Sequence, residues 1–217
     1  MLVVTVSALL AGCGQATSPA QVAPDEYVAP PVIAPEATKV FGADRVQQAY
    51  DELTAFALDR SYPAPFLDPQ DKTYTYEELT SGVQDHLTPS AAEDFALQAR
   101  AAAAGDADAQ DAIRPLEMFH LDEPAWTMPS DGDPVQTQQI TGLHIGLEEP
   151  SGFSPARLVV TYTDTAALEY LQDGATVDVD AKKTMTVWLL PSTAPTGPRW
   201  LIDQYDGDIT IGPQAGA

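Results

Sequence analysis

The side chains that could perform acid–base or metal chemistry in this chain are three histidines and several groups of aspartates. His86, His120 and His144 lie in separate segments of the sequence. Metal ions need ligands that converge on one point, and no HxxxH, HxH or cysteine-rich spacing brings these residues together. We therefore expect no histidine-based metal site and no cofactor.

His144 has the most specific setting of the three. It alternates with Leu143 and Ile145 in a segment of period two, so it faces away from the apolar side of a strand. Paired with a nearby aspartate, such a histidine suits general acid–base catalysis. A partly exposed or hydrogen-bonded strand histidine explains the same pattern more simply.

Aspartates at short spacing form the second candidate set. Asp178 and Asp180 share one face of an extended segment, and paired carboxylates can bind calcium or act as acid and base. The stretch 106–108 (Asp-Ala-Asp) lacks the glycine and the terminal glutamate of an EF-hand loop. Because 32 residues are acidic, close pairs arise by chance, and a solvated surface is the simpler interpretation. The other groups are Asp131 and Asp133, and Asp203, Asp206 and Asp208.

Covalent catalysis has no recognisable motif in this sequence. There is no Gly-x-Ser-x-Gly nucleophile turn and no glycine-rich phosphate loop. Aromatic side chains on the predicted strands mostly suit core packing. The residues that could line a pocket instead are His144, Tyr162, Trp188 and Tyr205. An enzyme is therefore the less favoured class.

The only cysteine, Cys13, follows Leu10-Ala11-Gly12 and an apolar run over residues 2–9. That run has the length of a secretory signal and is too short to span a bilayer. The pattern resembles a bacterial lipoprotein signal, in which such a tetrapeptide is the lipobox. The resemblance implies that Cys13 becomes the lipid-modified first residue of a mature chain 13–217. A truncated membrane helix, or a buried strand with an ordinary cysteine, is the alternative interpretation.

Two further observations bear on this signal. No lysine or arginine precedes Lys39, whereas signal peptides open with basic residues, so we expect translation to start upstream of Met1. A single cysteine forms no internal disulfide, and lipidation would protect it from oxidation outside the cell. We therefore expect a lipid-anchored protein on the extracytoplasmic face of a cell membrane.

The net charge of −22 excludes several classes of partner. Such a chain is repelled by nucleic-acid phosphates and by anionic lipid head groups, so the lipid is the expected membrane contact. Residues 13–40 are rich in proline and alanine and predict a tether after the signal peptide 1–12. We expect one globular domain over 41–211 and a disordered tail over 212–217.

Helical patterns occupy the first half of that domain. Apolar residues at helical spacing predict a helix over 44–60, which Asp44 and Gln47 would open as a capping box. A second capping box, Thr75 with Glu78, predicts a helix over about 76–86. Thr88-Pro89 predicts a third start, with a helix that runs to Gly105, and 106–114 predicts a short fourth helix.

After Pro134 the repeat of apolar residues changes from a helical period of 3.6 to a strand period of 2. Four segments, 143–147, 157–163, 184–190 and 200–205, alternate apolar and polar residues and are separated by turn-rich spacers. The predicted fold class is α+β, with N-terminal helices packed on a curved four-stranded antiparallel meander sheet.

This element order resembles the nuclear-transport-factor-two-like family, a cone of curved sheet around an N-terminal helix, and in particular actinobacterial envelope lipoproteins with such a domain. The resemblance covers about 41–210 and rests on the helix 46–58, on the helix start 87–89 and on the strand 200–205. It implies a docking or dimerising module of the cell envelope, or a cone pocket that binds a small apolar ligand. The alternatives are an enzyme that uses the cone pocket, with His144 and an aspartate, and a solute-binding receptor.

Overall fold

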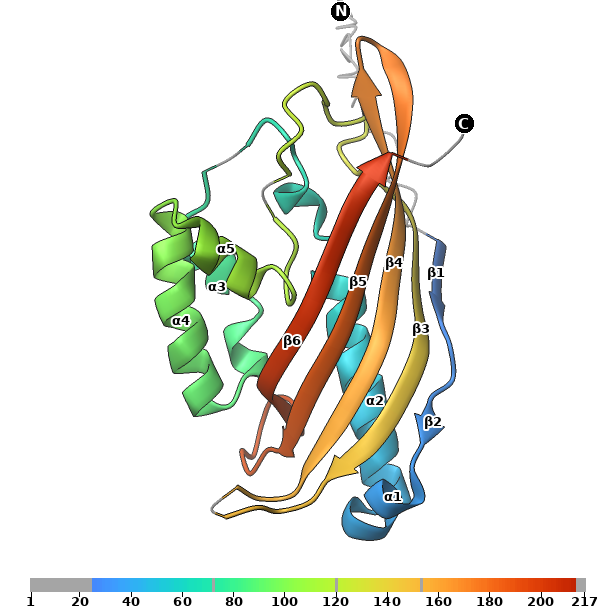
Figure 1. The fold of residues 1–217 in the computed structure, drawn as a ribbon, viewed down its shortest axis with the longest axis vertical. Coiled ribbons are helices and arrows are strands. Elements are labelled where there is room, and N and C mark those ends of the chain that lie inside the picture. The colour runs from blue at the N-terminus through green and yellow to red at the C-terminus, as the bar shows by residue number, and fades with distance from the viewer. Residues whose placement is uncertain (1–24, 72, 120, 153, 214–217) are drawn as a thin grey trace, which may run out of the picture.

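The protein is one sheet with helices packed on one of its faces and beside one edge (Figure 1). The computed structural model describes residues 25–71, 73–119, 121–152 and 154–213. The helices are α1 (Pro35–Phe41), α2 (Ala43–Arg60), α3 (Tyr76–Thr80), α4 (Pro89–Ala103) and α5 (Ala107–Ile113). The strands are β1 (Asp25–Val28), β2 (Val32–Ile33), β3 (Val135–Glu148), β4 (Arg157–Gln172), β5 (Ala175–Pro191) and β6 (Trp200–Pro213).

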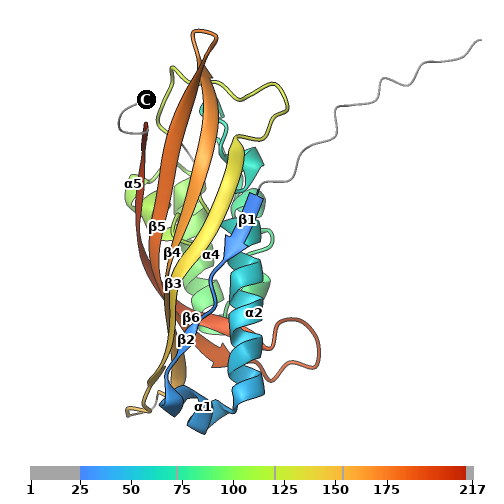
Figure 2. The same ribbon diagram turned by 90° about the vertical axis from the view of Figure 1, so that its right-hand side faces the viewer.

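The 18-residue helix α2 runs along the sheet (Figure 2). Its buried side chains recur at helical spacing and include Val46, Ala49, Leu53 and Phe56. The expected capping box at Asp44 and Gln47 is wrong. Instead Gly42, with a φ of 86°, ends α1 and precedes α2, and no side chain caps the helix start.

The remaining helix starts follow their local sequence. The capping box of Thr75 with Glu78 is confirmed at α3, although this helix ends at Thr80 and a separate 3₁₀ turn covers Gln84–His86. Thr88 caps α4, with Pro89 as the first helical residue, as expected. These caps satisfy backbone N–H groups that have no partner inside the helix.

The sheet contains six strands in the described residues, and its order is β1-β3-β4-β5-β6, with β2 also paired to β3. Strands β3 to β6 pair with their sequence neighbours in antiparallel fashion. They are long, with 14 to 17 residues each, and their side chains alternate between a buried inner face and an open outer face.

The predicted fold class, N-terminal helices on a four-stranded antiparallel meander, is wrong. Strands β1 and β2 precede every described helix and pair in parallel with β3, so the sheet is six-stranded and mixed. Both strands lie in the segment for which we expected a tether. The two prolines Pro30 and Pro31 separate the short strands, and prolines are tolerated beside an edge strand because one side of it needs no hydrogen bonds.

Two hydrophobic clusters form the core. The larger one joins α2, α4 and the inner face of the sheet, and includes Leu53, Phe95, Ile145 and Val187. The smaller one lies at the other end of the long strands, where the rings of Trp126 and Tyr170 stack with centroids 5.2 Å apart. No helix in the described parts of the chain is both long and apolar enough to cross a bilayer.

Candidate functional site

The inner face of the sheet carries a buried polar cluster beside the C-terminal end of α2. Asp164 on β4 and Lys183 on β5 are directly opposite each other in the strand register, and neither is exposed to solvent. Asp164 accepts hydrogen bonds from the Gln138 side-chain amide at 3.1 and 3.3 Å. The Lys183 ammonium donates to the carbonyl of Pro115 at 3.4 Å and lies 5.1 Å from the centre of the Tyr62 ring.

Glu117 extends this cluster towards the surface. Its carboxylate contacts the Arg60 guanidinium at 3.3 Å, and its side chain is 3% exposed. Burial raises the pKa of Glu117 to about 7, against the opposing effect of Arg60. Burial also raises the pKa of Asp164 and lowers that of Lys183, because the charged forms lose their hydration.

This cluster has the groups for acid–base chemistry, but its side chains do not line the recesses found in the described residues. The spaces found against the inner side of α2 are one of about 10 Å³, near Leu189, and one with no room for a water molecule, near Tyr162. Substrates need several hundred cubic ångströms. The described contacts of the cluster are hydrogen bonds and an ion pair to other groups of the fold.

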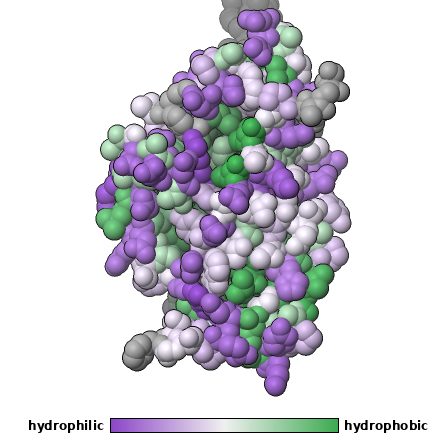
Figure 3. Space-filling model, viewed as in Figure 1, coloured by the Kyte–Doolittle hydropathy of each residue, from purple (hydrophilic) through white to green (hydrophobic). Residues whose placement is uncertain are grey.

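A groove of about 490 Å³ lies outside the core, between β6 and the segment that follows α5. Its walls come from α5, from the segment 114–123 and from the second half of β6. In Figure 3, hydrophobic side chains above the middle of the face in view are bordered by hydrophilic ones. The lining residues are Asp111, Arg114, Pro115, Met118, Leu121, Asp122, Glu123, Gly207, Asp208, Ile209 and Ile211.

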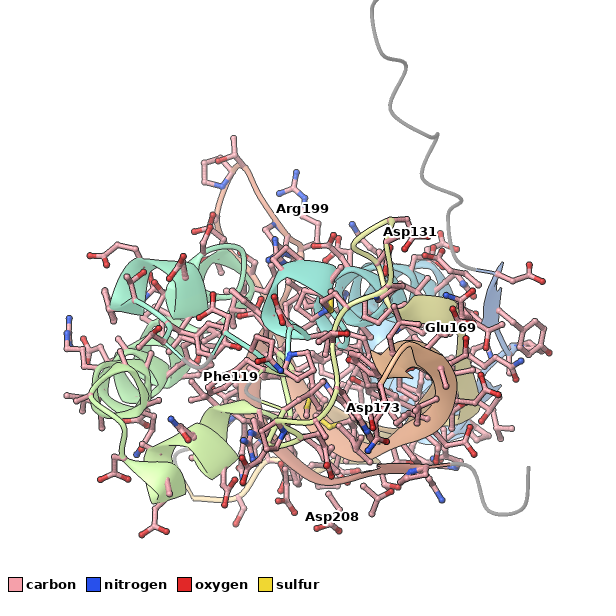
Figure 4. All side chains as sticks on the ribbon, turned by 90° about the horizontal axis from the view of Figure 1, so that it is seen from above. Phe119, Asp131, Glu169, Asp173, Arg199 and Asp208 are labelled. Atoms are coloured by element: carbon pink, nitrogen blue, oxygen red, sulfur yellow. The ribbon has the colours of Figure 1, made fainter. Side chains whose placement is uncertain are left out.

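The groove follows the edge of β6 rather than one face of the sheet. Ile209 and Ile211 belong to the inner face, where they pack against the smaller core cluster. The side chain of Asp208 points to the opposite face of the strand, is exposed, and extends away from the body of the molecule (Figure 4). Phe119, by contrast, is buried inside it. Side chains from both faces of β6 therefore line the groove, as expected for a space alongside a strand.

The rim of the groove is acidic and its floor is partly apolar. Arg114 forms an ion pair with Asp111 at 2.9 Å, which leaves Glu123 and Asp208 as further exposed carboxylates on the rim. At Gly207 any side chain would clash with Met185 and approach Pro115 at 3.2 Å, so glycine allows the segment after α5 to pack this closely. No cluster of three potential metal ligands occurs in the part of the chain that the structure describes.

The four residues expected as possible pocket lining lie on opposite faces of the sheet. Tyr162 and Tyr205 belong to the inner face, where burial raises the pKa of Tyr205 to about 12. His144 and Trp188 belong to the outer face. The guanidinium carbon of Arg157 lies over Trp188, 5.9 Å from the centre of the indole ring. These four side chains do not share a cavity in the described structure.

The other expected candidates are dispersed. The His86 ring packs against Phe56 at a tilt of 45°, with centroids 4.8 Å apart, and it lines an open surface recess of about 300 Å³. Burial lowers the pKa of His86. Asp178 and Asp180 lie on the exposed face of β5. His120 and Cys13, with the whole expected signal peptide, lie outside the described residues.

The sequence patterns predicted neither the buried pair of Asp164 and Lys183 nor the groove along β6. The buried pair had a detectable signal, because Asp164 and Lys183 each interrupt the apolar positions of an alternating strand. The groove had no such signal, because its two sides are more than 80 residues apart in sequence and meet only in the fold.

Comparison of the chain with protein-family models, with curated proteins and with solved structures gives no match.

Proposed function

We propose that this protein is a lipid-anchored binding protein of the cell envelope, whose globular domain docks a protein partner through the groove along β6. The observation that carries the proposal is the position of the groove. It is an open recess of about 490 Å³ on the outside of the domain, beside the outermost strand.

The packing of the sheet's inner face supports a protein partner over a small apolar ligand. In a cone-shaped domain such a ligand would occupy the space between α2 and the sheet. That space is filled by core side chains such as Leu53, Tyr162 and Val187. The groove itself has an acidic rim, which suits a polar, charged partner better than an apolar molecule.

The lipobox-like sequence that ends at Cys13 and the net charge of −22 support the proposed location. Lipid attached at Cys13 would hold the domain at the membrane, while its acidic surface is repelled from anionic head groups. The domain would thus be available to a partner in the envelope.

Site-specific photocrosslinking of the full chain in its own host tests this function. A photoreactive amino acid replaces Asp208 on the groove rim, and in a matched control it replaces Glu36 of α1, which is also acidic and exposed. We expect a discrete crosslinked protein from position 208 and none from position 36. Equal labelling from both positions, or none from either, contradicts docking at the groove.

A further inference from the structure

The groove lies along the part of β6 whose outer edge forms no backbone hydrogen bond to another described residue. β6 is the last strand of the sheet. Near its start this edge already accepts a backbone hydrogen bond, from Thr88 N to Ile202 O at 2.9 Å. From Asp203 to Pro213 no described residue outside β5 forms a backbone hydrogen bond to the strand. An unpaired edge of this kind is a template for another strand.

We infer that the groove binds an extended, basic peptide segment of the partner, which pairs with the edge of β6 as an additional strand. This inference rests on the proposed function and specifies the chemistry of the partner. At a rise of roughly 3.3 Å per residue, the groove section from Gly207 to Ile211 accommodates about five residues of an extended chain.

The side chains of the groove suit such a segment on both of its faces. Residues of an added strand alternate in direction, so one set would face Ile209, Ile211 and Met118, which form the apolar floor. The other set would face Asp208 on the outer side, and Glu123 lies on the opposite rim. Alternating apolar and basic residues therefore complement the groove.

Charge distinguishes this occupant from a second copy of the chain. Edge-to-edge pairing of two copies of β6 would bring Asp206 and Asp208 of each copy close to acidic groups of the other. Each copy also carries a net charge of −22. Like charges at close range cost free energy, whereas a basic segment is attracted to the same surface.

The test uses the intact protein and a fluorescein-labelled peptide, acetyl-(Lys-Val)₄-amide, with binding measured by fluorescence anisotropy at physiological salt. The first control is the Glu-Val peptide, which we expect not to bind. Two further peptides carry N-methyl groups on either all the lysines or all the valines. In a paired strand only alternate N–H groups face the neighbour, so one methylated peptide should lose binding and the other should keep it.

Protein variants locate the binding. We expect the double variant Asp208→Asn, Glu123→Gln to bind the Lys-Val peptide on the order of tenfold more weakly, because two rim charges are lost. The matched control Glu36→Gln, Asp44→Asn removes two exposed charges at a distance from the groove and should change binding less than about twofold.

Each other outcome overturns the inference. If both methylated peptides bind equally, the attraction is electrostatic and no strand is added. If no peptide binds although position 208 crosslinks to a partner, the strand mode fails while the proposed function stands. A crosslink from position 208 to another copy of this chain would show self-association instead, and loss of both peptide binding and crosslinking would contradict both proposals.

Discussion

Asp164 and Lys183 face each other across β4 and β5 with both side chains fully buried. Gln138 from β3, Tyr62 after α2 and the carbonyl of Pro115 complete the polar surroundings of this pair. Burial of two charges is costly, so each depends on the other for compensation. The pair therefore joins the inner face of the sheet to the segment after α2 and to the segment after α5.

Removing the acidic partner alone should be strongly destabilising. The substitution Asp164→Ala leaves Lys183 buried without a counter-charge, and we expect the free energy of unfolding to fall by about 3–5 kcal/mol. Urea denaturation measures the change. The double variant Asp164→Leu, Lys183→Met should lose less than the single variant, and Asp178→Ala on the exposed face of β5 serves as the control. A single variant as stable as the control would contradict this account.

Glu117 should make stability depend on pH. Its pKa in the folded protein, about 7, lies above the ordinary value of 4.5. The folded protein then binds a proton that the unfolded chain has released, so the free energy of unfolding falls as pH rises from about 4.5 to about 7. At about 1.4 kcal/mol per pKa unit, the fall attributable to Glu117 is at most on the order of 3 to 4 kcal/mol.

The substitution Glu117→Gln should remove this part of the pH dependence. Glutamine keeps the shape and an acceptor for Arg60 but has no titratable proton. Thermal or urea unfolding between pH 4.5 and 7.5 should give a flatter profile for the variant than for the wild type. The exposed-residue variant Glu123→Gln should retain the wild-type slope, and identical slopes for all three proteins would rule out the role of Glu117.

Arg157 connects all four long strands on the outer face. From β4 it donates to Glu148 of β3 at 2.6 Å and to Asp203 of β6 at 2.8 Å, and it covers Trp188 of β5. Because its side chain is only 15% exposed, we expect Arg157→Ala to cost about 1–3 kcal/mol. The exposed Lys182→Ala should cost less than about 1 kcal/mol in the same urea titration. Equal losses would mean that the network contributes nothing beyond surface charge.

Cys13 should determine membrane attachment. We expect Cys13→Ser to abolish lipid modification and to move the protein from the membrane fraction to the soluble extracellular fraction of its own host. Metabolic labelling with a fatty-acid analogue and fractionation measure the two effects, with Ser18→Ala as the control. A serine variant that stays labelled and membrane-bound would contradict the lipobox.

Local spacing was sufficient to predict some elements. Thr75 with Glu78, and Thr88 with Pro89, marked helix starts correctly because capping involves residues only three positions apart. The same spacing at Asp44 and Gln47 was misleading, because the backbone turns at Gly42 and α2 begins at Ala43, so Asp44 already lies inside the helix. A capping pattern is therefore reliable only where the preceding backbone leaves the first residue outside the helix.

Long-range pairing was not accessible in this way. Tyr27 of β1 pairs with Gln139 of β3, more than 100 residues away, and two prolines follow β1 closely, so the segment had the composition of a tether. Parallel pairing of so short a strand leaves no alternation to detect.

The sequence by itself determined the alternating faces of the long strands, two of the helix caps and the acidic character of the chain, because each depends on residue type and near-neighbour spacing; the lipobox at Cys13 stays a prediction. Only the tertiary structure decided the mixed sheet, the burial of Asp164 against Lys183 and the groove along β6. These depend on which distant segments pack together. That packing is selected by the burial of apolar surface over the whole chain, and no local stretch of sequence contains it.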